Sequence, residues 1–298
     1  MNRRQFLRTP AAAAALWRCD RLGAACNSRL RFGVAQFDKY DPLRDIAQLD
    51  KWGFDYCEPQ VVKIMTLSEA EFQSQLNEAR ATRIRVEAMN VLMPGDLKVV
   101  GPQVDQARIR DYIQKAFARA NALGAKVIVF GSGESRRVPE GFNRERAWLQ
   151  LQEFLHLLGG EIEKNGYGMV IGIEALRHEE SNILNTSSEA YNLAVQTNHP
   201  KVHIIVDFFH LASEGEDPAI LPYLNNHIVH LHFADASRGR LFPRTDSIDP
   251  RYAAFFSAIR EIGFDGRLSL EAYTNDFETD APAGLEAVRK LRERSCGG

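Results

Sequence analysis

The amino-acid sequence predicts a single-domain α/β protein with the (β/α)8 TIM-barrel fold. The chain has 298 residues, of which 45% are hydrophobic and 26% charged, so it can bury one large core. Eight short apolar segments alternate with amphipathic helical segments from residue 30 onward. Strict alternation of this kind predicts a closed parallel barrel, and a doubly wound open sheet is the alternative.

The eight predicted strands are rich in Val, Ile, Leu and Phe at nearly consecutive positions. Parallel strands covered by helices are apolar on both faces, which explains this pattern. The strands are residues 30–36, 56–59, 84–89, 126–130, 168–174, 202–207, 228–233 and 267–272.

Helical segments with identifiable ends separate these strands. Apolar residues recur at intervals of three and four across 104–123, and Gly124 follows, where a left-handed C-cap is expected. A second long helix is predicted over 144–164. Thr186 and Glu189 have the spacing of a capping box at the start of another helix.

The first residues differ in character from the barrel. Residues 1–28 contain the pair Arg3-Arg4 followed by an alanine run at 11–15, an order that resembles a twin-arginine export signal. This interpretation predicts a periplasmic protein; alternatively, the segment is a disordered basic arm and the protein is cytoplasmic. Residues 29–298 form the predicted catalytic barrel domain. We expect no membrane span, since one needs about 20 consecutive apolar residues.

Charge and cysteine content argue against a nucleic-acid-binding protein and against a zinc- or disulfide-stabilised scaffold. Thirty-seven Lys and Arg residues against 39 Asp and Glu residues give a formal net charge of −2, without the basic excess expected of a nucleic-acid-binding protein. The four cysteines include no CxxC pair, which argues against a structural zinc site or a disulfide framework.

Ionisable residues end four consecutive predicted strands. These residues are Glu174, Asp207, His232 and Glu271. In a TIM barrel the C-terminal ends of the strands form the active site. Three clustered carboxylates repel one another unless a cation lies between them. An oxygen-rich set with one imidazole therefore predicts one bound divalent ion: Mn²⁺, Co²⁺, Mg²⁺ or Zn²⁺.

Two motifs accompany these strand ends. Asp207-Phe208-Phe209-His210 follows the sixth strand, and His230-Leu231-His232-Phe233-Ala234-Asp235 covers the seventh. With the four strand-end residues, they resemble the xylose isomerase-like TIM-barrel superfamily, including ketose 3-epimerases of the D-tagatose 3-epimerase kind and hydroxypyruvate isomerases. The resemblance extends over the chain from Leu30 and implies possible homo-oligomers.

The resemblance also implies residue roles. All four strand-end residues would bind the metal, and the two glutamates would also transfer protons as the catalytic pair. Three further positions match contacts to the substrate: His210, Glu180 and Arg238.

The implied function is that of a divalent-metal-dependent sugar isomerase or epimerase. Such an enzyme abstracts a proton next to a carbonyl and passes through a metal-bound enediolate. A metal-dependent lyase or dehydratase acting on a keto-sugar, keto-inositol or 3-keto-glycoside uses the same groups and is the alternative. A non-catalytic sugar-binding barrel is a third interpretation. An endonuclease with several zinc ions is disfavoured, because all eight histidines lie at His156 or later.

Departures from the family pattern leave the substrate open. The family often has Asn-Arg where this chain has Arg177-His178, and Gly-Glu where it has Ala234-Asp235.

Other polar residues allow two interpretations. Glu58 ends the second strand and either joins the pocket or caps a loop. His230 alternates with His232, so we expect it one layer lower in the barrel, supporting the site. Four arginines either mark an anionic group on the substrate or lie solvated on loops: Arg136, Arg137, Arg238 and Arg240.

Overall fold

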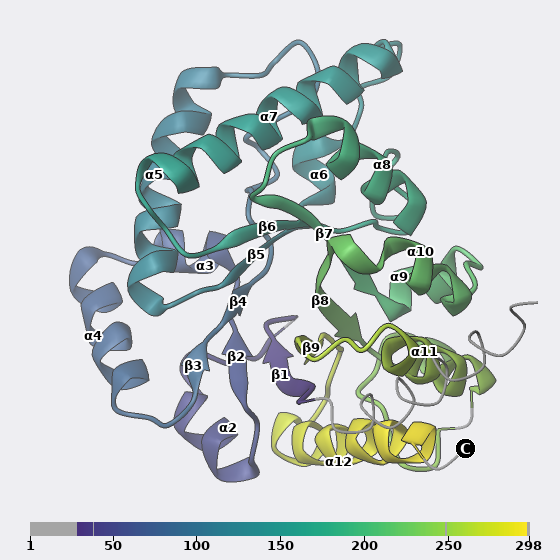
Figure 1. Ribbon diagram of the computed structural model, residues 1–298. Coiled ribbons are helices and arrows are strands. Elements are labelled where there is room, and N and C mark those ends of the chain that lie inside the picture. Colours follow the sequence, from purple (N-terminus) through teal and green to yellow (C-terminus); the bar gives the residue numbers. More distant parts are fainter. Residues whose placement is uncertain (1–28, 38, 248, 297–298) are drawn as a thin grey trace, which may run out of the picture.

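The computed structural model describes residues 29–37, 39–247 and 249–296. Its strands form one sheet of parallel neighbours in the order β3-β2-β1-β9-β8-β7-β6-β5-β4, with helices arranged around the outside (Figure 1). The predicted (β/α)8 barrel is therefore confirmed. The predicted export signal lies outside the described residues and stays a prediction.

The nine strands occupy eight barrel positions, because β3 (Arg85–Val86) and β4 (Ala88–Met89) are two halves of one strand. β3 pairs with β2 (Tyr56–Glu58), whereas β4 pairs with β5 (Val127–Phe130). Between the halves, the Glu87 amide donates to the Cys57 carbonyl at 3.4 Å, and the Glu87 carbonyl accepts from the Lys126 amide at 2.8 Å. One strand thus closes the barrel by changing partner at Glu87.

The remaining strands all lie within their predicted segments. They are β1 (Arg31–Ala35), β6 (Val170–Ile173), β7 (Val202–Asp207), β8 (Ile228–Phe233) and β9 (Arg267–Leu270).

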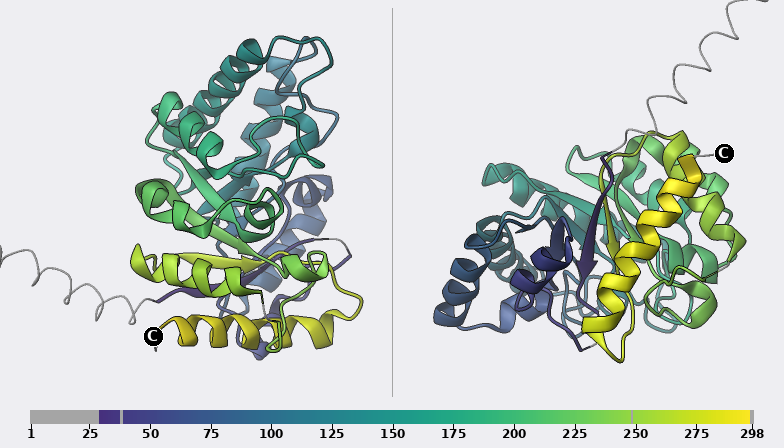
Figure 2. Two further views of the ribbon diagram at one scale, coloured as in Figure 1. Left: turned by 90° about the vertical axis from the view of Figure 1, so that its right-hand side faces the viewer. Right: turned by 90° about the horizontal axis from the view of Figure 1, so that it is seen from below.

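The helices form the outer layer, and Figure 2 shows them from two further directions. They are α2 (Ile46–Trp52), α3 (Val61–Thr66), α4 (Glu69–Arg80), α5 (Gln106–Leu123), α6 (Gly133–Arg136), α7 (Arg144–Lys164), α8 (Ser187–Thr197), α9 (Phe208–Ser213), α10 (Leu221–Leu224), α11 (Pro250–Glu261) and α12 (Phe277–Cys296), with 3-10 turns η1 (Pro218–Ile220), η2 (Asn225–His227) and η3 (Ala236–Arg238). Among these described helices, none is both long and apolar enough to cross a membrane.

Local capping sets the helix boundaries. The Asp105 side chain accepts from the amides of Ala107 and Arg108 at 3.1 and 3.0 Å, so α5 begins two residues later than predicted. Gly124, with φ +97°, ends it as predicted. The predicted capping box of α8 is confirmed.

The barrel interior is layered. Its lower part is filled by a small apolar cluster of Tyr56, Ala88, Val127, Val129 and Ile205. The ionisable strand-end residues lie at the C-terminal end of the strands, and His230 and Glu58 lie fully buried between the two layers.

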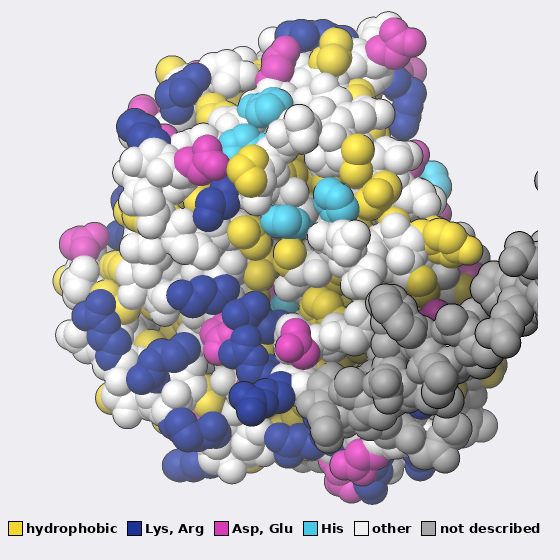
Figure 3. Space-filling model, viewed as in Figure 1, with side chains coloured by type: hydrophobic (Ala, Val, Ile, Leu, Met, Phe, Trp, Pro, Cys, Tyr) yellow, Lys and Arg dark blue, Asp and Glu magenta, His cyan; other side chains and the backbone are white. Residues whose placement is uncertain are grey.

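The N-terminal ends of the strands carry a basic surface. Arg31, Arg85 and Arg267 are the first residues of β1, β3 and β9. Glu87 pairs with Arg31 at 2.6 Å and with Arg267 at 2.7 Å, which partly neutralises this surface. Lys and Arg side chains gather over the region of β2 and β3 in Figure 3.

A glycine makes room for the large side chain at the base of the barrel. A Cβ added at Gly33 would overlap the Tyr56 ring, which is fully buried.

We expect Gly33→Ala to lower the free energy of unfolding by roughly 1–3 kcal/mol, because overpacked cores must shift. Urea denaturation measures this loss. Gly160→Ala in α7 is the control, because an added Cβ there meets nothing within 4 Å. Equal stability of the two variants would contradict the packing argument.

Candidate active site

The four strand-end residues lie together at the C-terminal end of the barrel. Glu174 follows β6, Asp207 ends β7, His232 lies in β8 and Glu271 follows β9. Each offers one ligand atom, and these atoms all lie within 4.8 Å of one another. These residues come together because neighbouring parallel strands end at the same edge of the barrel. All four are almost completely buried.

His232 is the centre of this cluster. Its Nδ1 lies 3.2 Å from Glu174 Oε1 and 3.4 Å from Glu271 Oε2. On the other side of the ring, Nε2 lies 3.0 Å from Glu58 Oε1. Burial alone would lower the pKa of His232, but Glu58 and Glu271 raise it well above its usual value. Without a bound cation, the imidazole is therefore protonated.

Glu58 lies beneath the cluster. Its Oε2 is 2.8 Å from His230 Nε2 and accepts from Ser269 Oγ at 2.5 Å. Burial would raise its pKa, but His230 and His232 lower it, so Glu58 is an ionised acceptor. Both imidazoles therefore donate Nε2–H to it, which directs His232 Nδ1 toward the carboxylates. The structure thus places Glu58 inside the barrel rather than at a loop cap, and His230 below His232 as expected.

Arg240 covers the cluster from the loop after β8. Its Nη2 donates to Glu271 Oε2 and lies 3.4 Å from Asp207 Oδ2, while Nη1 lies 3.3 Å from Glu180 Oε1. The side chain is 3% exposed. One guanidinium therefore contacts three acidic residues.

The guanidinium is held between two aromatic rings. Its central carbon lies 4.2 Å from the Phe37 ring centroid and 4.8 Å from that of Phe209.

The backbone of Arg240 has φ +71°, a conformation that arginine rarely adopts. The Arg240 amide donates to the Asp235 carbonyl, and its own carbonyl accepts from the Tyr273 amide at 2.7 Å. These contacts fix the backbone in this conformation.

The structure places the other predicted arginines elsewhere. Arg238 is exposed at the end of η3 and forms no ion pair with the described residues. Arg136 is buried, and its Nη1 donates to the Phe130 carbonyl at 3.0 Å. Arg137 pairs with the exposed Glu134 at 3.1 Å. The predicted substrate contact of Arg238 stays a prediction, whereas Arg240 is the arginine in the site.

His210 presents a hydrogen-bond donor to the site. The Arg177 amide donates to Nδ1 at 3.2 Å, so the proton of the neutral ring lies on Nε2. Nε2 has no hydrogen-bond partner among the described residues and lies 3.5 Å from Asp207 Oδ2. Burial and then Arg240 lower the pKa of His210 well below its usual value, so the ring is neutral.

Glu180 lies at the rim, beside His210. Its Oε1 accepts from Arg177 Nε at 2.8 Å, and its Oε2 lies 3.9 Å from His210 Nε2. The side chain is 32% exposed, so Glu180 is open to a ligand entering from solvent.

The two glutamates have opposite pKa shifts. Burial raises the pKa of Glu174 to about 7, with repulsion from Glu271 adding to it and the His232 hydrogen bond opposing it. Burial would also raise the pKa of Glu271, but His232 and Arg240 lower it to about 2. Near neutral pH, one carboxyl is partly protonated while the other is ionised. Such a difference is characteristic of acid and base pairs.

Asn90 belongs to the same site. It follows β4, and its Nδ2 donates to Glu271 Oε1 at 2.6 Å. Its position just after the predicted strand 84–89 is the one signal in the sequence that could have predicted this contact.

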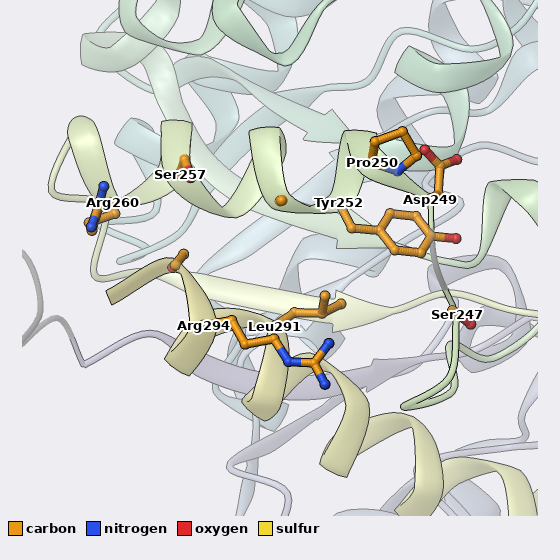
Figure 4. Close-up of a pocket in the computed structure, with 10 residues that line it drawn as sticks. Ser247, Asp249, Pro250, Tyr252, Ser257, Arg260, Leu291 and Arg294 are labelled. Atoms are coloured by element: carbon orange, nitrogen blue, oxygen red, sulfur yellow. The ribbon is translucent and has the colours of Figure 1, made fainter. Parts of the chain in front are cut away.

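A separate pocket lies on the outside of the barrel. It has a volume of about 500 Å³ and is lined by residues of α11 and α12 and by the loop before α11 (Figure 4). The hydroxyl of Tyr252 donates to Asp235, in the loop that follows β8 and leads to Arg240. The pocket includes none of the clustered carboxylates.

Comparison with known proteins identifies the family. The family model described as xylose isomerase-like TIM barrel matches residues 46–293, and the chain belongs to this family. The predicted resemblance is therefore confirmed.

Curated relatives are sugar epimerases, isomerases and a dehydratase. The chain is 33% identical over 165 residues to 3-dehydroshikimate dehydratase of Pseudomonas putida, covering 49% of this chain and 25% of the relative. It is 29% identical over 110 residues to ketose 3-epimerase of Arthrobacter globiformis, covering 36% of each. The matched part thus spans little more than a third of these relatives at most.

Solved structures share the fold. The 3-keto-D-glucoside 4-epimerase of E. coli has a TM-score of 0.71 at 19% identity, covering 89% of this chain and 99% of that chain. A crystal structure titled IolI, which holds a zinc atom, has a TM-score of 0.67 at 18% identity, covering 90% and 98%.

The pair of Glu58 and His232 gives a testable pH dependence. We expect Glu58→Gln to lower the free energy of unfolding of chelator-treated protein by about 3–5 kcal/mol, because it breaks a buried ion pair. Because the pKa of Glu58 is lowered, its charge stabilises the fold fully at pH values above its usual pKa of 4.5. Because the pKa of His232 is raised, its charge stabilises the fold fully at pH values below its usual pKa of 6.5. The difference between wild type and variant should therefore be largest between these pH values and shrink on either side.

Urea denaturation at pH 5.5 and pH 8.5 tests this dependence. Glu78→Gln is the control, because Glu78 is exposed on α4. The same difference at both pH values would show that Glu58 and His232 do not form a charged pair.

Proposed function

We propose that this chain is a metal-dependent enzyme that transfers a proton next to the carbonyl of a sugar or keto-sugar, as a sugar isomerase or epimerase. The observation that supports it is the convergence of Glu174 and Glu271 with Asp207 and His232 at the C-terminal end of the barrel, where each offers a ligand atom within 4.8 Å of the others. Enolisation needs a base for the C–H proton and an acid to return it. The kinds of enzyme among the relatives agree with this chemistry.

The donor set fits one divalent ion. Three carboxylates and His232 Nδ1 converge within 4.8 Å, and Glu58 leaves that nitrogen free to bind once the ring loses its second proton. Oxygen ligands with one imidazole suit Mn²⁺, Co²⁺, Mg²⁺ or Zn²⁺. The bound ion would act as a Lewis acid that stabilises negative charge developing on a carbonyl oxygen.

The residues of this chain then have separate tasks. Glu271, which accepts hydrogen bonds from Arg240 and Asn90, removes the proton, while Glu174 delivers one. His210 donates Nε2–H to a substrate oxygen, and Glu180 accepts from a hydroxyl at the rim. Return of the proton to the same carbon on its other face inverts the stereocentre, whereas return to the neighbouring carbon interconverts aldose and ketose.

A dehydratase is the second candidate. The 33% identity with a 3-dehydroshikimate dehydratase supports it. The same base would form the same enolate, and a leaving group on the next carbon would then depart. The product, rather than the site, distinguishes the two reactions.

Proton exchange tests the proposed function. We expect the Mn²⁺- or Mg²⁺-loaded protein to exchange the C–H proton beside a carbonyl for deuterium in D₂O. The substrates tested would be a panel of ketoses, keto-inositols, 3-keto-glycosides and 3-dehydroshikimate. After the reaction is quenched and the metal removed, proton NMR would measure the loss of this C–H signal. Glu271→Gln should slow exchange by roughly 10²–10⁴-fold, because it removes the base. Glu78→Gln is the control; a Glu271→Gln variant as fast as this control would refute the assignment.

Metal binding has its own test. We expect Asp207→Asn to weaken Mn²⁺ binding at least about tenfold by isothermal titration calorimetry, because a neutral amide replaces a carboxylate ligand. Asp207 also caps α9 by accepting from the Phe209 amide at 2.7 Å. Asn caps helices equally well, so the fold should persist. Unchanged Mn²⁺ affinity would exclude Asp207 as a ligand.

A further inference from the structure

Asn90 has a defined orientation in the site. Its Nδ2 lies between two acceptors, Glu271 Oε1 at 2.6 Å and the Gln36 carbonyl at 3.0 Å. Reversing the amide would place its oxygen against both acceptors, so these contacts identify which end carries the nitrogen. The side chain is 1% exposed.

The other end of the amide has no partner. Asn90 Oδ1 is buried and accepts no hydrogen bond from any of the described residues. Leaving a buried acceptor unpaired costs free energy, so most are paired in folded proteins. An amide oxygen can only accept, so the missing partner must be a donor such as a hydroxyl.

The backbone holds Asn90 in place. Its amide donates to the Pro59 carbonyl at 3.2 Å, and its carbonyl accepts from the Val61 amide at 2.9 Å. The next residue, Val91, has φ +45°, which is rare for a β-branched side chain. Strain of this kind persists only where the surroundings enforce it, and it concentrates at functional sites.

We propose that Asn90 positions Glu271 through Nδ2 and accepts a hydrogen bond from a substrate hydroxyl through Oδ1. This proposal rests on the proposed function and specifies the substrate. Nδ2 and Oδ1 share one carbon, so a hydroxyl bound to Oδ1 lies beside the carboxylate that removes the proton. His210 Nε2 offers an unpaired donor on the other side of the cluster. The two groups together select a substrate with an oxygen acceptor and a nearby hydroxyl, as in a hydroxy-ketone.

Coupling between Asn90 and one substrate hydroxyl is the decisive measurement. Proton exchange would be measured for the panel ketose that reacts and for its monodeoxy analogues. We expect Asn90→Leu to lower kcat/KM at least about tenfold on the parent ketose, and by a smaller factor on the analogue that lacks the bound hydroxyl, where only the contact with Glu271 is lost. An equal loss on the parent and every analogue would overturn the proposal.

Two further variants separate recognition from folding. Asn90→Asp keeps an acceptor oxygen but puts a second carboxyl against Glu271 where the amide donated, so it should lower kcat and keep the discrimination against the deoxy analogue. Loss of that discrimination would overturn the role of Oδ1, and unchanged kcat would overturn the positioning of Glu271. Asn182→Leu is the matched control, because Asn182 makes two hydrogen bonds to Val138, both at 2.9 Å, outside the carboxylate cluster.

A binding experiment distinguishes failure of this proposal from failure of the proposed function. Unreactive alditols and inositols would be titrated into Mn²⁺-loaded protein and followed by isothermal titration calorimetry. We expect Asn90→Leu and Asn90→Asp to differ at least about tenfold in affinity, the aspartate variant binding more tightly. Equal affinities, or no binding by wild type, would overturn the proposal. Binding that depends on Asn90, with no proton exchange on any ketose, would instead refute only the enolisation chemistry.

Discussion

Charge balance around the buried carboxylates is the constraint on which this site depends. Glu174, Asp207 and Glu271 each place an oxygen within 4.8 Å of the others at the C-terminal end of the barrel. All three residues are buried, so little water can screen their charges. Carboxylates this close cannot all be ionised without nearby positive charge. Here His232 supplies a positive charge from below, and Arg240 supplies one from above.

Each of these two cations is itself held by another part of the chain. Glu58 accepts Nε2–H of His232 and so makes the ring bridge two acidic layers of the barrel. Arg240 depends on a loop that Asp235 organises, since the Asp235 side chain accepts hydrogen bonds from Ser237, Ser247 and Tyr252. The site is thus connected through side chains to β2 on one side and to α11 on the other.

The fold was predictable because its signals are local. Eight apolar segments and their caps each specify one element, and all eight contain the observed strands. The change of partner at Glu87 has no such signal, because it depends on how the barrel closes. The four strand-end residues were predictable for the same reason as the strands that carry them.

Residues on loops were less predictable. The sequence indicated Arg238 as a substrate contact, which stays a prediction, but it did not single out Arg240, which enters the carboxylate cluster after η3 and the left-handed Gly239. The roles of Glu58 and Asn90 depend on contacts with residues more than 170 positions away, which no local pattern specifies.

The opposite pKa shifts of Glu174 and Glu271 follow from contacts with distant parts of the chain rather than from residue type. Glu174 and Glu271 have the same side chain, the same burial and the same neighbour in His232 Nδ1. They differ in their other contacts, because Arg240 and Asn90 both donate to Glu271. His232 and then Arg240 lower the pKa of Glu271, whereas burial and repulsion from Glu271 raise the pKa of Glu174. Substitutions in the outer contacts could therefore change which glutamate holds the proton while all four strand-end residues stay the same.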